Sequence, residues 1–207
     1  MKKLVRLLLL SLVLVSGVSF AAPKFKAKEK KSVLSFKEFK VYAQDVSKGN
    51  HFIPSGWMGD TGDLSYNSAC LESPKTGKSC IKILYSAKKS QGQGWAGIFW
   101  QEPANNWGDK KGAGYDLTGA TKLTFWARGA KGGEKIAEFK IGGITGEYPD
   151  SDSASIESIV LTKEWREYTI DLKGKDLSYI IGGFCFALSK KDNPNGCAFY
   201  LDNISYK

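Results

Sequence analysis

The chain has 207 residues, a formal net charge of +9 and an aromatic content of 13%. About 165 residues from Phe36 onward suit one domain with a sizeable core. No nucleic-acid-binding motif accompanies the basic charge, so we expect no nucleic-acid partner.

Residues 1–21 have the pattern of a bacterial signal peptide. They begin with the basic Lys2, Lys3 and Arg6, and an apolar run follows at 7–15. Their removal takes three of the 30 basic residues and none of the 21 acidic ones, which lowers the net charge from +9 to +6. No later stretch approaches the ~20 apolar residues of a transmembrane helix. We therefore expect an exported protein, periplasmic or extracellular, without a transmembrane segment in the mature chain.

Residues 22–35 form a basic N-terminal arm, in which Glu29 stands among five lysines: Lys24, Lys26, Lys28, Lys30 and Lys31. Such a run is usually a solvated tail. Polybasic clusters also bind anionic surfaces, so an anionic envelope surface is the second interpretation of the arm.

Short runs rich in β-branched and aromatic residues recur from residue 36 to residue 207, separated by Gly, Pro, Asn and Asp. The predicted strands are Phe36–Tyr42, Leu64–Cys70, Cys80–Ser86, Trp95–Gln101, Thr121–Arg128, Lys135–Ile141, Ser155–Leu161, Arg166–Leu172, Tyr179–Leu188 and Ala198–Tyr206. No segment sustains the 3.6-residue apolar period of a helix. The pattern predicts an all-β fold, a two-sheet antiparallel β-sandwich with jelly-roll topology.

Four cysteines suit an oxidising compartment, and four cysteines allow three pairings. Cys70 and Cys80 flank one turn sequence, and Cys185 and Cys197 flank another. The simplest prediction is therefore two local disulfides, Cys70–Cys80 and Cys185–Cys197.

The stretch from Gly94 to Gly108 holds three of the six tryptophans. Strand alternation places Trp95, Gly97, Phe99 and Gln101 on one face, opposite Ala96, Ile98 and Trp100. Pro103 and the Asn-Asn pair then turn the chain and leave Trp107 on a loop. Aromatic rings beside amides suit stacking and hydrogen bonding to sugars, although Trp is mostly buried on average.

Three motifs occur in order: Leu-Thr-Gly-Ala-Thr-Lys-Leu-Thr-Phe-Trp-Ala-Arg-Gly at 117–129, Leu-Thr-Lys-Glu-Trp-Arg-Glu-Tyr-Thr-Ile-Asp-Leu at 161–172, and Phe-Tyr-Leu-Asp-Asn-Ile at 199–204. On these motifs the chain from Val41 onward resembles non-catalytic carbohydrate-binding modules of the galactose-binding-like jelly-roll type. The resemblance implies the same β-sandwich. It supports the fold more strongly than the ligand, because such frameworks bind very different glycans.

The same resemblance implies a structural calcium ion near the chain termini. Asp202 occupies the position of the acidic ligand in the closing motif, and Asp45 is the partner that we nominate. The alternative for Asp202 is a turn or edge-strand acid without metal.

The sequence offers no catalytic constellation. No strand carries the alternating acids that would supply the two carboxyl groups of a glycosidase, and Glu134 and Glu138 are expected to be solvated. The single histidine, His51, has no Gly-x-Ser-x-Gly partner. We therefore predict that the protein is not an enzyme.

Two functions remain. The first is a secreted protein that binds a polysaccharide or glycoconjugate by aromatic stacking and amide hydrogen bonds. Its predicted ligand-binding residues are Trp57, Tyr66, Gln101, Asn105, Asn106, Trp107 and Arg128. The second is a structural or adhesive envelope protein that uses the sandwich to bind protein partners.

Overall fold

The computed structural model describes residues 36–44 and 48–207. The predicted signal peptide, the basic arm and Asp45 lie outside these residues, so they stay predictions. Within the described part no helix is long and apolar enough to span a bilayer.

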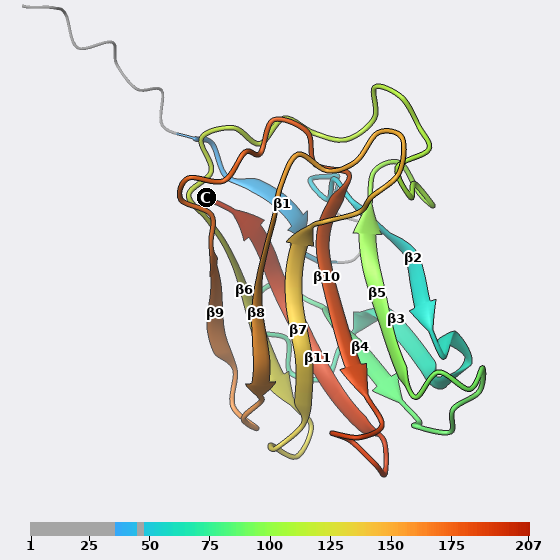
Figure 1. Cartoon of the computed structure of the whole chain (residues 1–207). Helices are drawn as coiled ribbons and strands as arrows, with labels where there is room; N and C mark the ends of the chain where they lie inside the picture. Colours follow the sequence, from blue (N-terminus) through green and yellow to red (C-terminus); the bar gives the residue numbers. More distant parts are fainter. Residues whose placement is uncertain (1–35, 45–47) are drawn as a thin grey trace, which may run out of the picture. The chain divides into compact units, whose positions relative to one another are not determined.

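The fold is an all-β sandwich of two antiparallel sheets, as the strand pattern predicts. Its elements are β1 (Phe39–Tyr42), β2 (Ile53–Gly59), a 3₁₀ turn (Thr61–Asp63), β3 (Leu64–Cys70), β4 (Cys80–Tyr85), β5 (Trp95–Gln101), β6 (Lys122–Gly129), β7 (Lys135–Gly142), β8 (Ser153–Val160), β9 (Arg166–Asp171), β10 (Gly182–Ser189) and β11 (Cys197–Tyr206). The six-stranded sheet has the order β3-β4-β11-β6-β9, and β1 pairs with β11. The five-stranded sheet has the order β2-β5-β10-β7-β8. Figure 1 shows the two sheets as layers, with β5, β10 and β7 in front of β4 and β11.

The core lies between the two sheets and is rich in aromatic rings. Phe125 of the six-stranded sheet packs 4.6 Å from Phe139 and 5.2 Å from Phe184 of the other sheet, measured between ring centroids. Ile170 and Leu172, which the alternation assigns to the same core, are also buried. Burial of such side chains contributes about 1.5–3 kcal/mol each to folding, so this layer is the main stabilising element.

β2 is a strand that the sequence pattern did not predict. Its residues Ile-Pro-Ser-Gly-Trp-Met-Gly carry the Pro, Ser and Gly that usually mark turns. The strand forms nonetheless because it lies at the edge of the five-stranded sheet, where the N–H group that proline lacks is not needed for a ladder hydrogen bond. A register shift between Pro54 and Gly56 absorbs the irregularity as a bulge.

The cysteine prediction needs correction, because all four cysteines are free thiols in the structure. Cys185 of β10 lies on the outer face of the five-stranded sheet beside Phe99, whereas Cys197 at the start of β11 packs against the main core, so the two side chains do not face each other and the predicted Cys185–Cys197 bridge is not formed. Cys70 and Cys80 are direct partners across β3 and β4 and pack in one cluster with Tyr200, but no bond joins them. A turn sequence between two cysteines therefore predicted a spatial contact correctly for Cys70 and Cys80, but not for Cys185 and Cys197.

Oxidation of the Cys70–Cys80 pair is a testable expectation. If the chain is exported, as its sequence predicts, peptide mapping without reduction should find Cys70 linked to Cys80, and Cys185 and Cys197 as thiols. Burial raises the pKa of the Cys80 thiol to about 12, with a further contribution from the Cys70 thiol, so the bridge should form slowly without a catalyst. Four alkylated cysteines after export would contradict the expectation.

Candidate functional site

The alternation predicted for β5 is confirmed by the burial of its side chains. Ala96, Ile98 and Trp100 are fully buried between the sheets, and Trp95 is 38% exposed on the opposite face. Phe99 shares that outer face and packs in a small separate cluster with Cys185 of β10. One strand thus contributes a tryptophan to the core and another tryptophan to the surface.

Trp107 lies above the same outer face. It is 43% exposed, and its ring meets Phe99 edge-on with the centroids 6.2 Å apart. Trp95 and Phe99 are four residues apart on one strand, about 13 Å along its axis. We call the outer face of the five-stranded sheet around Trp95, Gly97, Phe99 and Trp107 the tryptophan face.

Two loops hold Trp107 in place, and both lie at the same end of the five-stranded sheet, as Figure 1 shows. Gly108 adopts φ 85°, and a Cβ at this position would overlap the carbonyl of Thr145. Tyr148 N donates to Gly108 O at 2.8 Å, and Gly146 lies against the carbonyls of Trp107 and Gly108. The 102–114 loop can approach the 143–152 loop this closely only because both carry glycine at the contact.

Gln101 and Asn106, predicted as sugar ligands, instead hold this loop. Gln101 is fully buried: its Nε2 donates to Asn106 O at 2.8 Å, and its Oε1 accepts from Ser55 Oγ at 2.9 Å. Asn106 is also fully buried, donating to Glu102 O at 3.0 Å and accepting from Gly108 N at 3.0 Å. Both amides are buried and hydrogen-bonded within the protein, where they hold the loop that carries Trp107. Asn105 remains exposed beside them.

Trp57 and Tyr66 lie elsewhere. Trp57 is opposite Ile98 in the ladder, so its side chain points away from the tryptophan face, toward the gap between β2 and β3. There its ring meets Tyr66 at 6.5 Å, and Tyr66 meets the buried Trp100 at 6.0 Å. These residues close the edge of the sandwich and are separate from Trp107.

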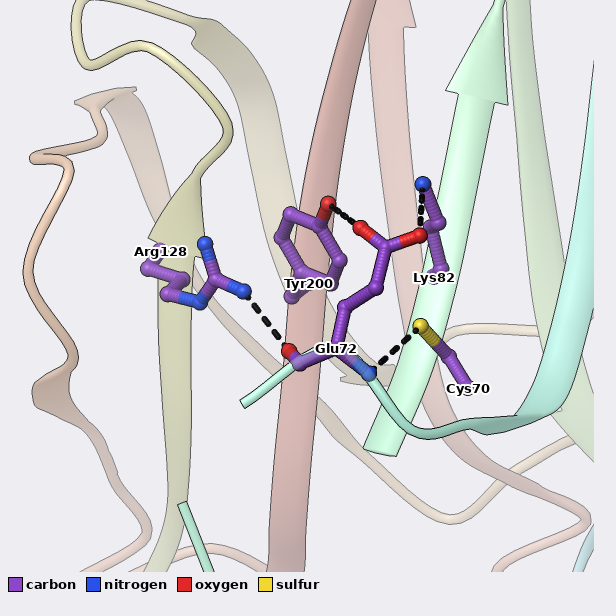
Figure 2. Close-up of polar contacts among 5 residues, drawn as sticks. All are labelled: Cys70, Glu72, Lys82, Arg128 and Tyr200. Carbon is purple, nitrogen blue, oxygen red and sulfur yellow. Dashed lines mark hydrogen bonds and ion pairs between the residues drawn. The ribbon is translucent and has the colours of Figure 1, made fainter. Parts of the chain in front are cut away.

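Arg128 lies on the outer face of the six-stranded sheet (Figure 2). Its guanidinium lies 3.7 Å from the centroid of the Tyr200 ring and donates to Glu72 O at 2.9 Å. Glu72 accepts from Tyr200 Oη at 2.5 Å and pairs with Lys82 at 2.5 Å, and these hydrogen bonds, first from Lys82, lower the pKa of its carboxyl. Arg128 therefore fastens the segment after Cys70 to the sheet, so the prediction that it shares a site with Trp107 is wrong.

Asp202 is fully buried and binds backbone. Its Oδ2 accepts from Lys75 N at 2.8 Å and from Thr76 N at 2.9 Å, and Thr76 Oγ1 lies 3.4 Å from Oδ1. No group of three His, Cys, Asp or Glu side chains that could hold a metal occurs among residues 36–44 and 48–207. The described residues around Asp202 thus do not form a calcium site by themselves, and with Asp45 undescribed the calcium ion stays a prediction.

The other half of the tryptophan face is polar. Lys140 of β7 pairs with Cys185 of β10, which in turn pairs with Phe99 of β5. In the same way, Glu138 pairs with Ala187, which pairs with Gly97. Ser155 and Glu157 of β8 pair with Lys140 and Glu138 and line a groove of about 500 Å³ with them. The face therefore offers aromatic surface at β5 and hydrogen-bonding groups at β7 and β8, although the sequence had marked only the aromatic part.

Comparison of structures finds the same architecture in modules that bind carbohydrate. A family 11 carbohydrate-binding module of the cellulosomal cellulase Lic26A-Cel5E of Clostridium thermocellum aligns with a TM-score of 0.53 at 17% identity, over 83% of this chain and 95% of that one. A family 30 module of the cellulosomal cellulase Cel9D-Cel44B of the same organism aligns with a TM-score of 0.54 at 13% identity, over 83% and 97%. The chain has the fold of a carbohydrate-binding module. No model of a protein family and no curated protein sequence matches it.

A third solved structure of this fold shows the family 11 module of Clostridium thermocellum in complex with a β-1,3-1,4-mixed-linked tetrasaccharide. It aligns with a TM-score of 0.53 at 17% identity, over 82% of this chain and 94% of that one. At this identity the likeness establishes the β-sandwich, and the jelly-roll fold predicted from the three sequence motifs is confirmed.

Asp60 secures the segment that leads into Trp95. Its buried carboxylate accepts from the backbone N–H groups of Gln91 at 2.8 Å, Gln93 at 2.9 Å and Gly94 at 2.6 Å. Burial acts to raise the pKa of Asp60, but these three hydrogen bonds and the charge of Lys89 together outweigh it, and the pKa lies below its ordinary value of 3.8. The ionised carboxylate is therefore the form that stabilises the fold.

Asp60→Asn should lower the melting temperature at neutral pH. Because the folded-state pKa of Asp60 is depressed, its contribution is complete above the unfolded value near 3.8 and is lost as the pH falls through the lower folded value. The melting temperatures of wild type and variant should accordingly converge in acid. A difference that stays constant from pH 7 down to strongly acidic pH would contradict this role.

Proposed function

We propose that this chain is an exported, non-catalytic glycan-binding protein that binds a polysaccharide along its tryptophan face. The observation that carries the proposal is the exposure of Trp95 and Trp107 on one face of a sheet whose fold is that of carbohydrate-binding modules. Sugar rings stack on exposed aromatic rings through their apolar faces, and two such rings on one face of a sheet offer a surface of that kind.

The polar half of the face supports the same proposal. A stacked sugar ring presents hydroxyl groups at its edge, and carboxylates and ammonium groups hydrogen-bond them. Glu138, Lys140 and Glu157 lie two or three strands from β5, about 10–14 Å away at ordinary strand spacing. An extended glycan can therefore contact a tryptophan and these polar groups at once.

A β-linked glucan is the first probe, because a relative of this fold was solved with a mixed-linkage tetrasaccharide. The mature protein should be applied to a glycan array, and binders should be titrated by calorimetry. The proposal predicts saturable binding of an oligosaccharide. Should no glycan bind, the envelope-protein interpretation replaces it, in which the exposed tryptophans contact a protein partner.

The non-catalytic part of the proposal has its own assay. Glu138 and Glu157 are direct ladder partners, and retaining glycosidases use two carboxyl groups about 5 Å apart. The half-buried Glu138 and exposed Glu157 stand side by side on one sheet surface, whereas catalysis places the two carboxyls on either side of the scissile bond. We expect no release of reducing ends from a bound glycan. If the wild type releases reducing ends and the Glu138→Gln variant does not, the protein is catalytic and this part of the proposal is wrong.

A further inference from the structure

A hollow of about 750 Å³ at one end of the sandwich has Glu134 in its wall. Glu134 is 7% exposed and its Oε1 accepts from Lys131 N at 2.7 Å, so the expectation that Glu134 is solvated is wrong. Its carboxylate packs against the backbone of Gly129 and is not open to the hollow. A more accessible charged group lies on the outer face of the six-stranded sheet.

A groove of about 370 Å³ lies on that face, on the opposite side of the sandwich from the tryptophan face. It is lined by residues 73–75, which follow β3, by residues 163–165, which lead into β9, and by Arg128 of β6. It shares no residue with the tryptophan face or with the polar groove at β7 and β8. A ligand in this groove therefore leaves the glycan site free.

Arg128 is held between two aromatic rings. The central carbon of its guanidinium lies 3.7 Å from the centroid of the Tyr200 ring and 5.2 Å from that of the half-buried Trp165. Trp165 is itself fixed, because its Nε1 donates to Ser73 O at 2.9 Å. A guanidinium that is already fixed in this way loses little conformational entropy when it binds a ligand.

One terminal nitrogen of this guanidinium is free for a ligand. Nη2 donates to Glu72 O at 2.9 Å, and Nε is buried. Nη1 has no hydrogen-bond partner within residues 36–44 and 48–207 and, unlike Nε, is not buried. In Figure 2 the terminal nitrogen that is not bonded to Glu72 O points away from Glu72.

The carboxylate of Glu72 does not neutralise Arg128. Its Oε1 accepts from Lys82 Nζ and its Oε2 from Tyr200 Oη, both at 2.5 Å. The pKa of Glu72 is lowered first by Lys82 and then by Tyr200, and only last by the charge of Arg128. Both carboxylate oxygens are thus engaged, and Arg128 reaches only the backbone of this residue.

The groove carries more positive than negative charge. Lys75, Arg128 and Lys163 line it, against a single acid, the exposed Glu164. None of the three cations takes part in an ion pair with another described residue. The groove therefore presents three positive charges and one negative charge to a ligand.

Strand geometry places Lys75 beside Arg128. The Lys75 amine lies 4.0 Å from the centroid of the Trp126 ring. Trp126 and Arg128 are two residues apart on β6, so they point to the same face with about 7 Å between them. The ammonium and the guanidinium accordingly lie over neighbouring positions of one strand, within reach of a single ligand.

We propose that this groove binds an acidic sugar unit of an anionic polymer, through a carboxylate or phosphate group that accepts hydrogen bonds from Arg128 Nη1 and pairs with the Lys75 amine. Hydrogen bonds between charged partners are roughly twice as strong as those between neutral ones. Trp165, beside Arg128, offers apolar surface to the sugar ring. The site attaches the domain to an acidic polymer through the face opposite the glycan site, and it does not depend on that site.

The test compares three sugars with the same ring: glucose, glucuronate and glucose 6-phosphate. Each is titrated into the mature protein and followed by backbone amide NMR shifts. We expect saturable shifts at residues 73–75, 128 and 163–165 with an acidic sugar and none at these residues with glucose. The acidic sugar that binds more tightly identifies the anionic group, and added sodium chloride should weaken its binding because salt screens surface charges. Equal shifts with glucose, no shifts with either acidic sugar, or shifts confined to the basic arm at 22–35 would each overturn the proposal.

Variants of the lysines and of Arg128 complete the test. Arg128→Gln should weaken binding of the acidic sugar at least tenfold, about 1.4 kcal/mol. Lys75→Gln should weaken it a few-fold and should fold, because Lys75 is tied to Asp202 through its backbone N–H and not through its amine. The matched control is Lys122→Gln, an exposed lysine of the same strand β6 outside the groove, which should bind as wild type does.

Trp107→Ala should also bind the acidic sugar as wild type does, so failure of the glycan site and failure of this groove are distinguishable. Thermal melting verifies that each variant folds, and Lys75→Gln carries the test by itself should Arg128→Gln unfold. Unchanged affinity in Lys75→Gln, or an equal loss in Lys122→Gln, would show that the groove is not the site.

Discussion

Replacing Trp107 with alanine should weaken binding of a glycan at least tenfold, about 1.4 kcal/mol, without unfolding the protein. The ring is 43% exposed and contacts the domain edge-on through Phe99, so its removal costs little core packing. A sugar stacked on the ring would lose its apolar partner. Calorimetric titration with an oligosaccharide identified on the array measures the loss, and thermal melting verifies the fold.

Trp95→Ala should produce a loss of similar size, since Trp95 lies on the same face and is 38% exposed. Trp57→Ala is the matched control: this tryptophan is 37% exposed but points toward β3, so its removal should leave glycan affinity unchanged. Folded Trp95 and Trp107 variants with wild-type affinity would move the site away from the tryptophan face. An effect at Trp57 alone would move it to the edge between β2 and β3.

Asp202→Ala should lower the free energy of unfolding by about 2–4 kcal/mol, because it leaves the amides of Lys75 and Thr76 without an acceptor. Burial raises the pKa of Asp202 although these hydrogen bonds oppose the shift, so keeping this carboxylate ionised in the folded protein costs free energy. Chemical denaturation of the variant measures the change. Glu167→Ala, at an exposed acid on β9, two strands from β11 in the same sheet, is the control and should change stability by less than about 0.5 kcal/mol.

The same variant tests the calcium prediction. A calcium ion that binds only the folded state should raise the melting temperature of the wild type. At a hundredfold excess of calcium over its dissociation constant, the free energy of unfolding should increase by about 2.7 kcal/mol. That response should vanish in Asp202→Ala. Identical melting of the wild type in calcium and in chelator would show that the calcium prediction is wrong, and that the backbone of Lys75 and Thr76 is the partner of Asp202.

Those features of the protein that depend on local pattern could be predicted from the sequence. Alternation along 95–101 separated Trp100, a core residue, from Trp95, a surface residue, because successive side chains of a strand point to opposite faces. The same argument placed Phe125, Ile170 and Leu172 in the core. Pro103 and the two asparagines correctly ended the strand and left Trp107 exposed. The β-sandwich follows from many such strands and few helical signals.

Only the tertiary structure decided which residues meet. Amides such as those of Gln101 and Asn106 look alike in a sequence whether they face a sugar or close a loop, and only their partners in space distinguish the two. Strand order and register are long-range properties, and they separated Arg128 from Trp107 and placed Glu138 opposite Glu157. Cys185 and Cys197 are near in sequence but belong to different sheets, because the turn between β10 and β11 carries the chain from one layer of the sandwich to the other.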